Sequence, residues 1–137
     1  MNLKNSLIGL LLMAVSAGAM AEWTKIGGGT NASSGDYDNY ADLSTIRKSG
    51  NTAKMWVLRD YKKAQTATNG KSYLSSMARQ EYDCNEEKSS GLTIYAYSGN
   101  MKNGDIVDGV DTEENQWHSI LPESTGATAF KVACGAK

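Results

Sequence analysis

Residues 77–91, MARQEYDCNEEKSSG, contain Cys84, one of only two cysteines in the chain. The approach to this cysteine is ambiguous, because residues 73–84 carry apolar side chains at a helical spacing and also present one face of a strand. The polar residues 85–91 that follow predict a hairpin loop. Whether the Cys84 thiol is a nucleophile, a metal ligand or half of a crosslink therefore decides how this part of the fold is held.

Residues 1–21 have the pattern of a secretory signal peptide, with Lys4 before an apolar run at residues 7–15 and small residues ending at Ala21. The apolar run is shorter than the roughly 20 residues that a membrane-spanning helix needs. No cysteine follows the expected cleavage point, so the sequence lacks the lipid acceptor of a bacterial lipoprotein. We expect an exported protein in the periplasm, at the cell surface or outside the cell.

Export favours a disulfide between Cys84 and Cys134, because paired thiols are stable in oxidising compartments. Closing a loop of this length would stabilise the fold by roughly 4 kcal/mol in the chain-entropy model. A redox pair would prefer the close Cys-x-x-Cys spacing, and a zinc site would need two further ligands where only His118 is available. The sequence predicts a structural disulfide.

Residues 22–137 predict a single domain with one core. They contain thirteen basic and fifteen acidic side chains, a net charge of −2. Nucleic-acid binding is driven by a concentrated basic surface. The composition therefore argues against a nucleic-acid partner.

Two segments have clear strand patterns. TAKMWVLRDYKK, residues 52–63, has an uninterrupted apolar run that favours a central strand, and LTIYAYS, residues 92–98, alternates apolar and polar positions. Weaker patterns predict a short strand at residues 23–26 followed by a glycine loop at 27–29, a short strand and helical turn within residues 37–46, and a short strand at 105–107.

The C-terminal segment LPESTGATAFKVACGAK predicts a helix that begins at a Ser124 or Thr125 cap and ends at Gly135. Phe130 and Cys134 share its apolar face, which must lie on the sheet. A helix this short is marginal in isolation. The crosslink to Cys84 would therefore fasten the helix to the sheet.

The residues that carry chemistry form no recognisable catalytic or metal-binding pattern. His118 is the only histidine and has no nucleophile signature around it. The acidic residues at 105–114 and 36–42 do not have the spacing of a calcium-binding loop. We therefore expect no enzyme, no cofactor and no metal.

A basic and aromatic surface is the remaining candidate site. Lys62 and Lys63 end the predicted central strand, and Lys71 follows a turn, so the three are expected near one end of the sheet together with Tyr73. Exposed tyrosines at 73, 95 and 97 would be anchors of the kind enriched in protein interfaces. Isolated surface charges and core tyrosines are the more ordinary interpretation.

The segments YADLSTIRKSGNTAKMWVLRDY, SSMARQEYDC, YSGNMKNGDIV, ILPES and FKVAC, in this order, resemble the surface-adhesin protein E family of Gram-negative bacteria over residues 23–134. The resemblance implies an α+β fold: an antiparallel β-sheet of about six strands with a C-terminal α-helix packed on one face and tied to it by the disulfide. It makes the ambiguous segment before Cys84 a strand, and it implies a homodimer.

The resemblance also implies a non-enzymatic virulence function, namely binding of host extracellular proteins such as vitronectin, laminin and plasminogen. The alternative is a periplasmic or envelope protein of the same fold that binds an internal partner or a small ligand. The missing lipid-acceptor cysteine favours a periplasmic or envelope location and therefore the alternative. The family resemblance favours the adhesin.

Overall fold

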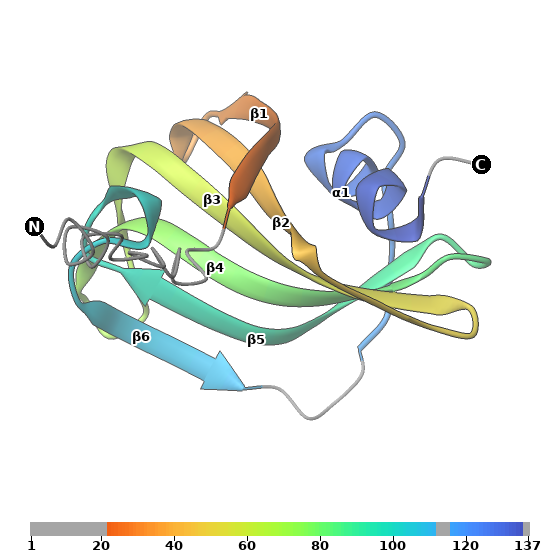
Figure 1. The fold of residues 1–137 in the computed structure, drawn as a ribbon. Helices are drawn as coiled ribbons and strands as arrows, with labels where there is room; N and C mark the ends of the chain where they lie inside the picture. Colours follow the sequence, from red (N-terminus) through yellow and green to blue (C-terminus); the bar gives the residue numbers. More distant parts are fainter. Residues whose placement is uncertain (1–21, 112–115, 136–137) are drawn as a thin grey trace, which may run out of the picture.

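The computed structural model describes residues 22–111 and 116–135, so the expected signal peptide at residues 1–21 lies outside the described residues. Figure 1 shows a curled sheet with a helix against one face and a short 3-10 turn, η2, at the far end. The elements in chain order are β1 (Trp23–Asn31), β2 (Gly35–Ser49), β3 (Thr52–Thr66), β4 (Ser72–Asp83), β5 (Lys88–Tyr97), η2 (Asn100–Lys102), β6 (Ile106–Asp111), β7 (His118–Ser119) and α1 (Thr125–Cys134).

The sheet is an antiparallel meander in the order β1-β2-β3-β4-β5-β6. The two-residue strand β7 pairs with the start of β5. The prediction of a six-stranded antiparallel sheet with a C-terminal helix is confirmed. The ambiguous segment before Cys84 is strand β4, as the family resemblance implies.

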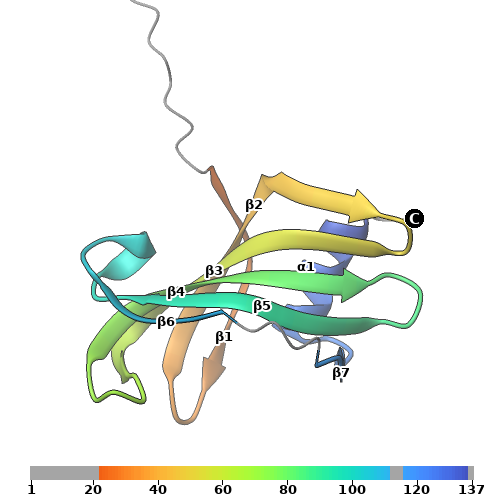
Figure 2. The ribbon, with the colours of Figure 1, turned by 90° about the horizontal axis from the view of Figure 1, so that it is seen from below.

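The central strand β3 divides its side chains between two faces of the sheet. Ala53 and Met55 are fully buried against α1, whereas Trp56 points to the opposite face. We call the face that carries α1 the helix face and the opposite one the outer face. Figure 2, seen from below, shows α1 behind the strands of the sheet. The main core therefore lies between α1 and the helix face of the sheet.

The expectation of a glycine loop after residue 26 is wrong, because β1 continues to Asn31 and pairs with β2 from Gly27 onward, after a register shift between Lys25 and Gly27. Gly29 pairs with Tyr37, and a Cβ added at Gly29 would lie 2.8 Å from the Tyr37 hydroxyl oxygen. The glycines let the edge of β1 run close to the larger side chains of β2. Long-range pairing, which the local pattern does not contain, overrides the turn propensity.

The expected helical turn within residues 37–46 is also absent, since this segment belongs to the single long strand β2. The β2–β3 register shifts between Asp42 and Arg47. Asp42 is buried, and its carboxylate accepts hydrogen bonds from the backbone N–H of Ser44 at 3.0 Å and from the Ser44 hydroxyl at 2.5 Å. A β-bulge thus stands where the helical turn was expected.

Two further boundaries differ from expectation. The β4–β5 hairpin turns at residues 84–87, and the remaining polar residues already belong to β5. The strand expected at 105–107 is β6, which extends to Asp111 because it pairs with β5 from Thr93 to Tyr97. Pairing with a long neighbour therefore lengthens both segments beyond what their local composition indicates.

The helix α1 begins and ends as predicted. The Ser124 hydroxyl accepts a hydrogen bond from the Ala127 backbone N–H at 3.0 Å, which is a standard N-cap. Gly135 follows the last turn with φ +83°, a conformation that favours glycine. Ala129 and Ala133 are buried against the sheet, and the Phe130 ring meets Tyr82 of β4 edge-on.

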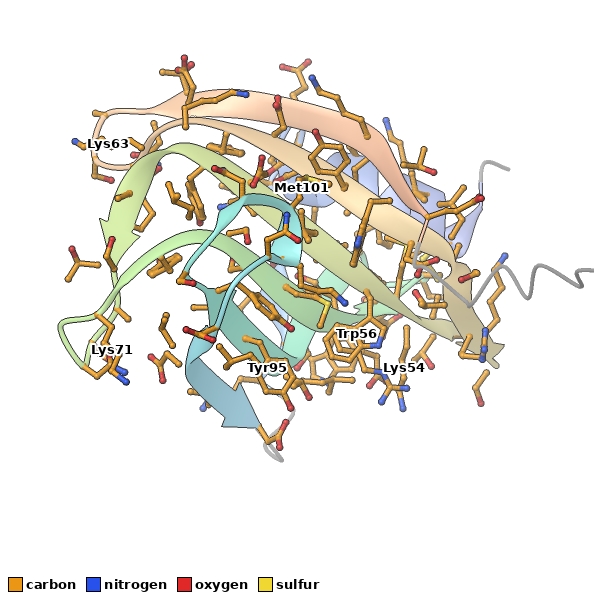
Figure 3. The ribbon with its side chains drawn as sticks, turned by 60° about the vertical axis from the view of Figure 1, so that its left-hand side comes forward. Lys54, Trp56, Lys63, Lys71, Tyr95 and Met101 are labelled. Carbon is orange, nitrogen blue, oxygen red and sulfur yellow. A yellow bond between two sulfur atoms is a disulfide. The ribbon has the colours of Figure 1, made fainter. Side chains whose placement is uncertain are left out.

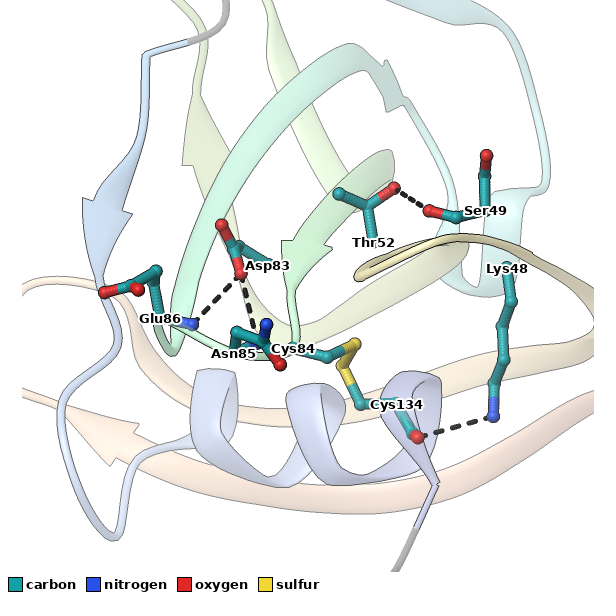
Figure 4. The surroundings of a disulfide bond; sticks show 8 residues. All are labelled: Lys48, Ser49, Thr52, Asp83, Cys84, Asn85, Glu86 and Cys134. Carbon is teal, nitrogen blue, oxygen red and sulfur yellow. Dashed lines mark hydrogen bonds between the residues drawn. A yellow bond between two sulfur atoms is a disulfide. The ribbon is translucent and has the colours of Figure 1, made fainter.

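The predicted disulfide between Cys84 and Cys134 is confirmed, with a Cα–Cα distance of 5.7 Å. Figure 4 shows that it joins the end of β4 to the last residue of α1. The Cys84 backbone N–H donates to the Asn51 carbonyl in the β2–β3 turn at 2.8 Å, and Lys48 donates to the Cys134 carbonyl at 3.3 Å. Two hairpin ends and the helix therefore meet at the crosslink.

Candidate functional site

The basic residues predicted near one end of the sheet lie in different settings. β3 continues to Thr66, so Lys62 and Lys63 lie within the strand and not at its end. The Lys63 stem lies beside Gly35, and Lys71 is exposed at the β3–β4 connection. Figure 3 places Lys63 and Lys71 at the same end of the molecule but at separate corners.

Lys62 is engaged in an ion-pair cluster on the outer face. Its Nζ lies 3.6 Å from the Asp38 carboxylate, which Lys25 approaches from β1 at 3.1 Å. The hydrogen bond from Lys25, with a smaller contribution from Lys62, holds the pKa of Asp38 below its usual value. Lys62 therefore already has an acidic partner within the protein.

Tyr73 belongs to an aromatic cluster on the helix face, away from Lys62. Its ring meets Tyr61 edge-on at 5.9 Å, and Tyr61 meets Tyr37 at 6.3 Å. The Arg59 guanidinium carbon lies 4.5 Å from the centre of the Tyr37 ring, within cation–π distance. Burial raises the pKa of Tyr73. The four predicted residues are thus distributed over both faces of the sheet at this end.

The outer face has an open central region whose residues were not predicted from the sequence to lie together. Trp56 of β3 lies directly opposite Arg79 of β4, with Lys54 two residues before it, and in the next row Met77 lies opposite Tyr95 of β5. All five side chains are half-buried. Figure 3 shows Trp56, Lys54 and Tyr95 gathered on one surface. We call these five residues the outer patch.

The geometry of Tyr95 is set by a glycine on the neighbouring strand. Gly109 of β6 is the direct partner of Tyr95, and a Cβ added there would lie 2.9 Å from Cδ1 of the ring. The tyrosine therefore covers the glycine backbone and remains at the surface. An aromatic side chain over a cross-strand glycine is a stable pairing in β-sheets.

The other end of the outer face is closed by the turn that contains η2. The Asp60 carboxylate accepts from the Met101 backbone N–H at 2.8 Å and from the Asn100 side chain at 3.0 Å. The Ser75 hydroxyl donates to the Gly99 carbonyl at 2.6 Å. The expectation that Tyr97 is exposed is wrong, because this turn leaves it only 9% exposed.

The part of the chain that the structure describes contains neither a metal-ligand cluster nor a membrane-spanning helix. Within residues 22–111 and 116–135, no group of three or more histidine, cysteine or acidic side chains has the arrangement of a metal site. His118 is exposed in β7. None of the described helices has the length and apolar character needed to cross a bilayer.

These features define a class: a small antiparallel β-meander whose terminal helix is fixed by a disulfide and whose opposite sheet face is open. The chain belongs to the surface-adhesin protein E family, whose family model matches residues 23–135. A search of curated proteins finds no significant match.

Solved structures support the fold. A crystal structure of protein E from non-typeable Haemophilus influenzae is similar with a TM-score of 0.54 and 13% identity, covering 82% of this chain and 74% of the other. A second structure of Haemophilus influenzae protein E has a TM-score of 0.54 and 14% identity, covering 80% of this chain and 83% of the other. At such low identity the likeness shows the fold alone.

Proposed function

We propose that this protein is an exported, non-enzymatic binding protein that recognises host extracellular matrix or plasma proteins. Family membership supports the adhesin class, and the outer patch is the observation that carries the proposal. Trp56, Tyr95 and Arg79 are the residue types most enriched at energetic hot spots of protein interfaces. They lie on adjacent strands, so one partner surface would meet all three.

The physical setting of the outer patch suits protein binding. The sheet fixes the backbone at these positions, and the Trp56 and Tyr95 rings have few rotatable side-chain bonds, so they lose little conformational entropy when a partner docks. Lys54 and Arg79 flank the aromatic rings, which favours a partner with acidic groups around an apolar centre. Lys63, Lys71 and Tyr73 remain a second proposed contact region at the end of the sheet.

A binding assay separates the two regions. Vitronectin, laminin and plasminogen would be immobilised and titrated with the wild type, with a Trp56→Ala, Tyr95→Ala double variant, and with a Lys63→Ala, Lys71→Ala double variant. Loss of a hot spot worth 2 kcal/mol or more corresponds to about thirtyfold weaker binding. We expect that loss for the aromatic variant and a smaller, salt-dependent loss for the lysine variant.

Leu121→Ala provides the control, because this side chain is 72% exposed in the connection between β7 and α1 and belongs to neither region. Circular dichroism and thermal unfolding of each variant would show that the fold is retained. If the wild type binds none of the three host proteins, or if the aromatic variant binds like Leu121→Ala, the proposed interface is wrong.

Location is tested by protease digestion of intact cells against cells with a permeabilised outer membrane. An adhesin must be digested on intact cells. Protection until permeabilisation would place the protein in the periplasm and favour the alternative of an internal partner or a small ligand.

A further inference from the structure

A cavity of about 330 Å³ lies on the helix face, beside the N-terminal end of α1. α1 packs mainly over β1, β2 and β3, so the surface of β4 and β5 beside the helix stays uncovered. The volume is at the lower end of the range of about 300–1,000 Å³ for small-molecule sites. The space is therefore large enough for a small ligand but not for a protein segment with bulky side chains.

The floor of the cavity is apolar. Val57, Ala78 and Ile94 are direct cross-strand neighbours on β3, β4 and β5 and form one continuous row. Ile94 is 45% exposed, so part of this row is open to solvent. Covering this row would remove apolar surface from water, which is favourable at roughly 25 cal/mol per Å².

One wall carries a single charge without a counter-ion. The Arg59 Nε donates to Asn39 Oδ1 at 3.1 Å, and Nη2 reaches the Thr125 hydroxyl at 3.5 Å. No carboxylate among the described residues lies within ion-pair distance of Arg59, and no acidic side chain lines the cavity. Since a guanidinium has five N–H donors, several of them are available to a ligand.

Asn39 and the N-terminus of α1 lie beside Arg59 and add further N–H donors to the cavity. Asn39 lines the cavity and is only 8% exposed, and its Oδ1 accepts from Arg59, which leaves its amide NH₂ with no hydrogen-bond acceptor among the described residues. Thr125 and Gly126 also line the cavity, at a helix N-terminus whose first turn has no acidic residue. The helix dipole therefore adds positive potential to that of the guanidinium.

We propose that this cavity binds a small carboxylate with an apolar body. The carboxylate accepts hydrogen bonds from the Arg59 guanidinium and the Asn39 amide. A guanidinium commonly binds a carboxylate through two parallel hydrogen bonds. The apolar body covers Val57, Ala78 and Ile94. The site lies on the opposite face of the sheet from the outer patch, so it goes beyond the proposed function and does not rest on it.

The test is an NMR titration of the ¹⁵N-labelled protein with octanoate. We expect saturable shifts of the Thr125 and Gly126 amides and of the row on β3, β4 and β5. Octanol and octylammonium have the same body without the carboxylate, and they should bind at least tenfold more weakly. N-acetyl-alanyl-leucine, titrated in parallel, distinguishes a free acid from the carboxyl end of a peptide as the natural source.

Two variants keep the test decisive. Arg59→Met should reduce octanoate affinity by tenfold or more, because it removes the charge and its donors. Arg59 also holds Asn39 and Tyr37, so Ala78→Leu, which fills the floor and leaves the donors in place, serves as the second variant and should also reduce binding. Lys131→Ala, at an exposed position of α1 that does not line the cavity, should bind octanoate like the wild type.

Absence of saturable shifts with both octanoate and the dipeptide would overturn the proposal. It would also fail if octanol bound as tightly as octanoate, or if the shifts mapped to the outer patch. Because none of these readouts involves a host protein, failure here leaves the proposed adhesin function untouched.

Discussion

The Tyr95 ring of β5 lies across Gly109 of β6, its direct partner in the sheet. A Gly109→Ala substitution places a Cβ 2.9 Å from Cδ1 of that ring, closer than such contacts occur. Tyr95 must then leave its position in the outer patch. We expect a loss of about 1–3 kcal/mol in the free energy of unfolding, typical of overpacking, together with weaker partner binding.

Urea denaturation measures this change. Gly27→Ala is the matched control, because a Cβ at Gly27 meets no atom within 4 Å. Its effect should stay within about 0.5 kcal/mol, as for ordinary surface substitutions. Equal destabilisation by the two variants would show that the Tyr95 contact contributes nothing specific.

The disulfide gives the second prediction. Cys84 and Cys134 are separated by 50 positions, for which the chain-entropy model gives about 4 kcal/mol. Cys84→Ser, Cys134→Ser and the double variant should each lower the free energy of unfolding by a few kcal/mol. Amide hydrogen exchange should show α1 opening more readily than β3 or β4, because the helix loses its covalent attachment to the sheet.

Reduction supplies the control for the crosslink. Dithiothreitol should destabilise the wild type by the same amount as the double substitution and should leave the double variant unchanged. Two free thiols in the mass spectrum of protein taken from the cell envelope would contradict the crosslinked-helix architecture.

Features encoded locally were predictable from the sequence. The apolar run around Trp56 lies in β3, and the alternation that begins at Leu92 lies in β5, which ends at Tyr97. The Ser124 cap and Gly135 bound the helix. Two cysteines in an exported chain leave a single pairing. The strand and helix signals depend on residues close together in the sequence, and the disulfide follows because two cysteines allow only one pair.

Features that depend on distant partners were not predictable. The strand character of residues 27–29 depends on pairing with β2, and the burial of Tyr97 depends on a turn that folds back over the sheet. The outer patch and the cavity each need three strands in register. Among the described residues, Arg59 is the only charged side chain that lines the cavity, and it carries no local sequence signal that separates it from other strand arginines.

The third prediction concerns alkaline stability. Burial raises the pKa of Tyr82, which is 2% exposed beneath α1, well above its ordinary value near 10. The folded state therefore retains a proton that the unfolded chain releases. The stabilisation is fully present below pH 10 and is lost as the pH rises from 10 toward the folded-state pKa.

Tyr82→Phe removes this linkage. Between pH 10 and 11 the wild type should lose up to about 1.4 kcal/mol more free energy of unfolding per pH unit than the variant. Urea denaturation at pH 7, 10 and 11 measures the difference, with the values at pH 7 as the reference. Parallel pH profiles for the two proteins would contradict the prediction, because they would mean that the Tyr82 hydroxyl loses its proton equally in the folded and the unfolded state.

The fourth prediction concerns self-association at the sheet edge. The outer edge of β6 pairs with no strand among the described residues, and it carries Ile106, 57% exposed, and Val110, 50% exposed. An open, apolar edge is a template for pairing with another chain. We therefore expect a homodimer in which two copies of β6 pair antiparallel. Asp108 and Asp111 of both copies then come close together, so added salt should strengthen the dimer by screening their repulsion.

Sedimentation velocity over a range of concentrations measures the association. Val110→Asp adds a further like charge to the edge and should yield a monomer at concentrations where the wild type is dimeric. Leu43→Asp introduces the same charge at an apolar position that is 46% exposed on β2, far from β6 in the strand order, and should remain dimeric. A wild type that is monomeric throughout would exclude the dimer, and a dimer that survives Val110→Asp or weakens in salt would place the interface elsewhere.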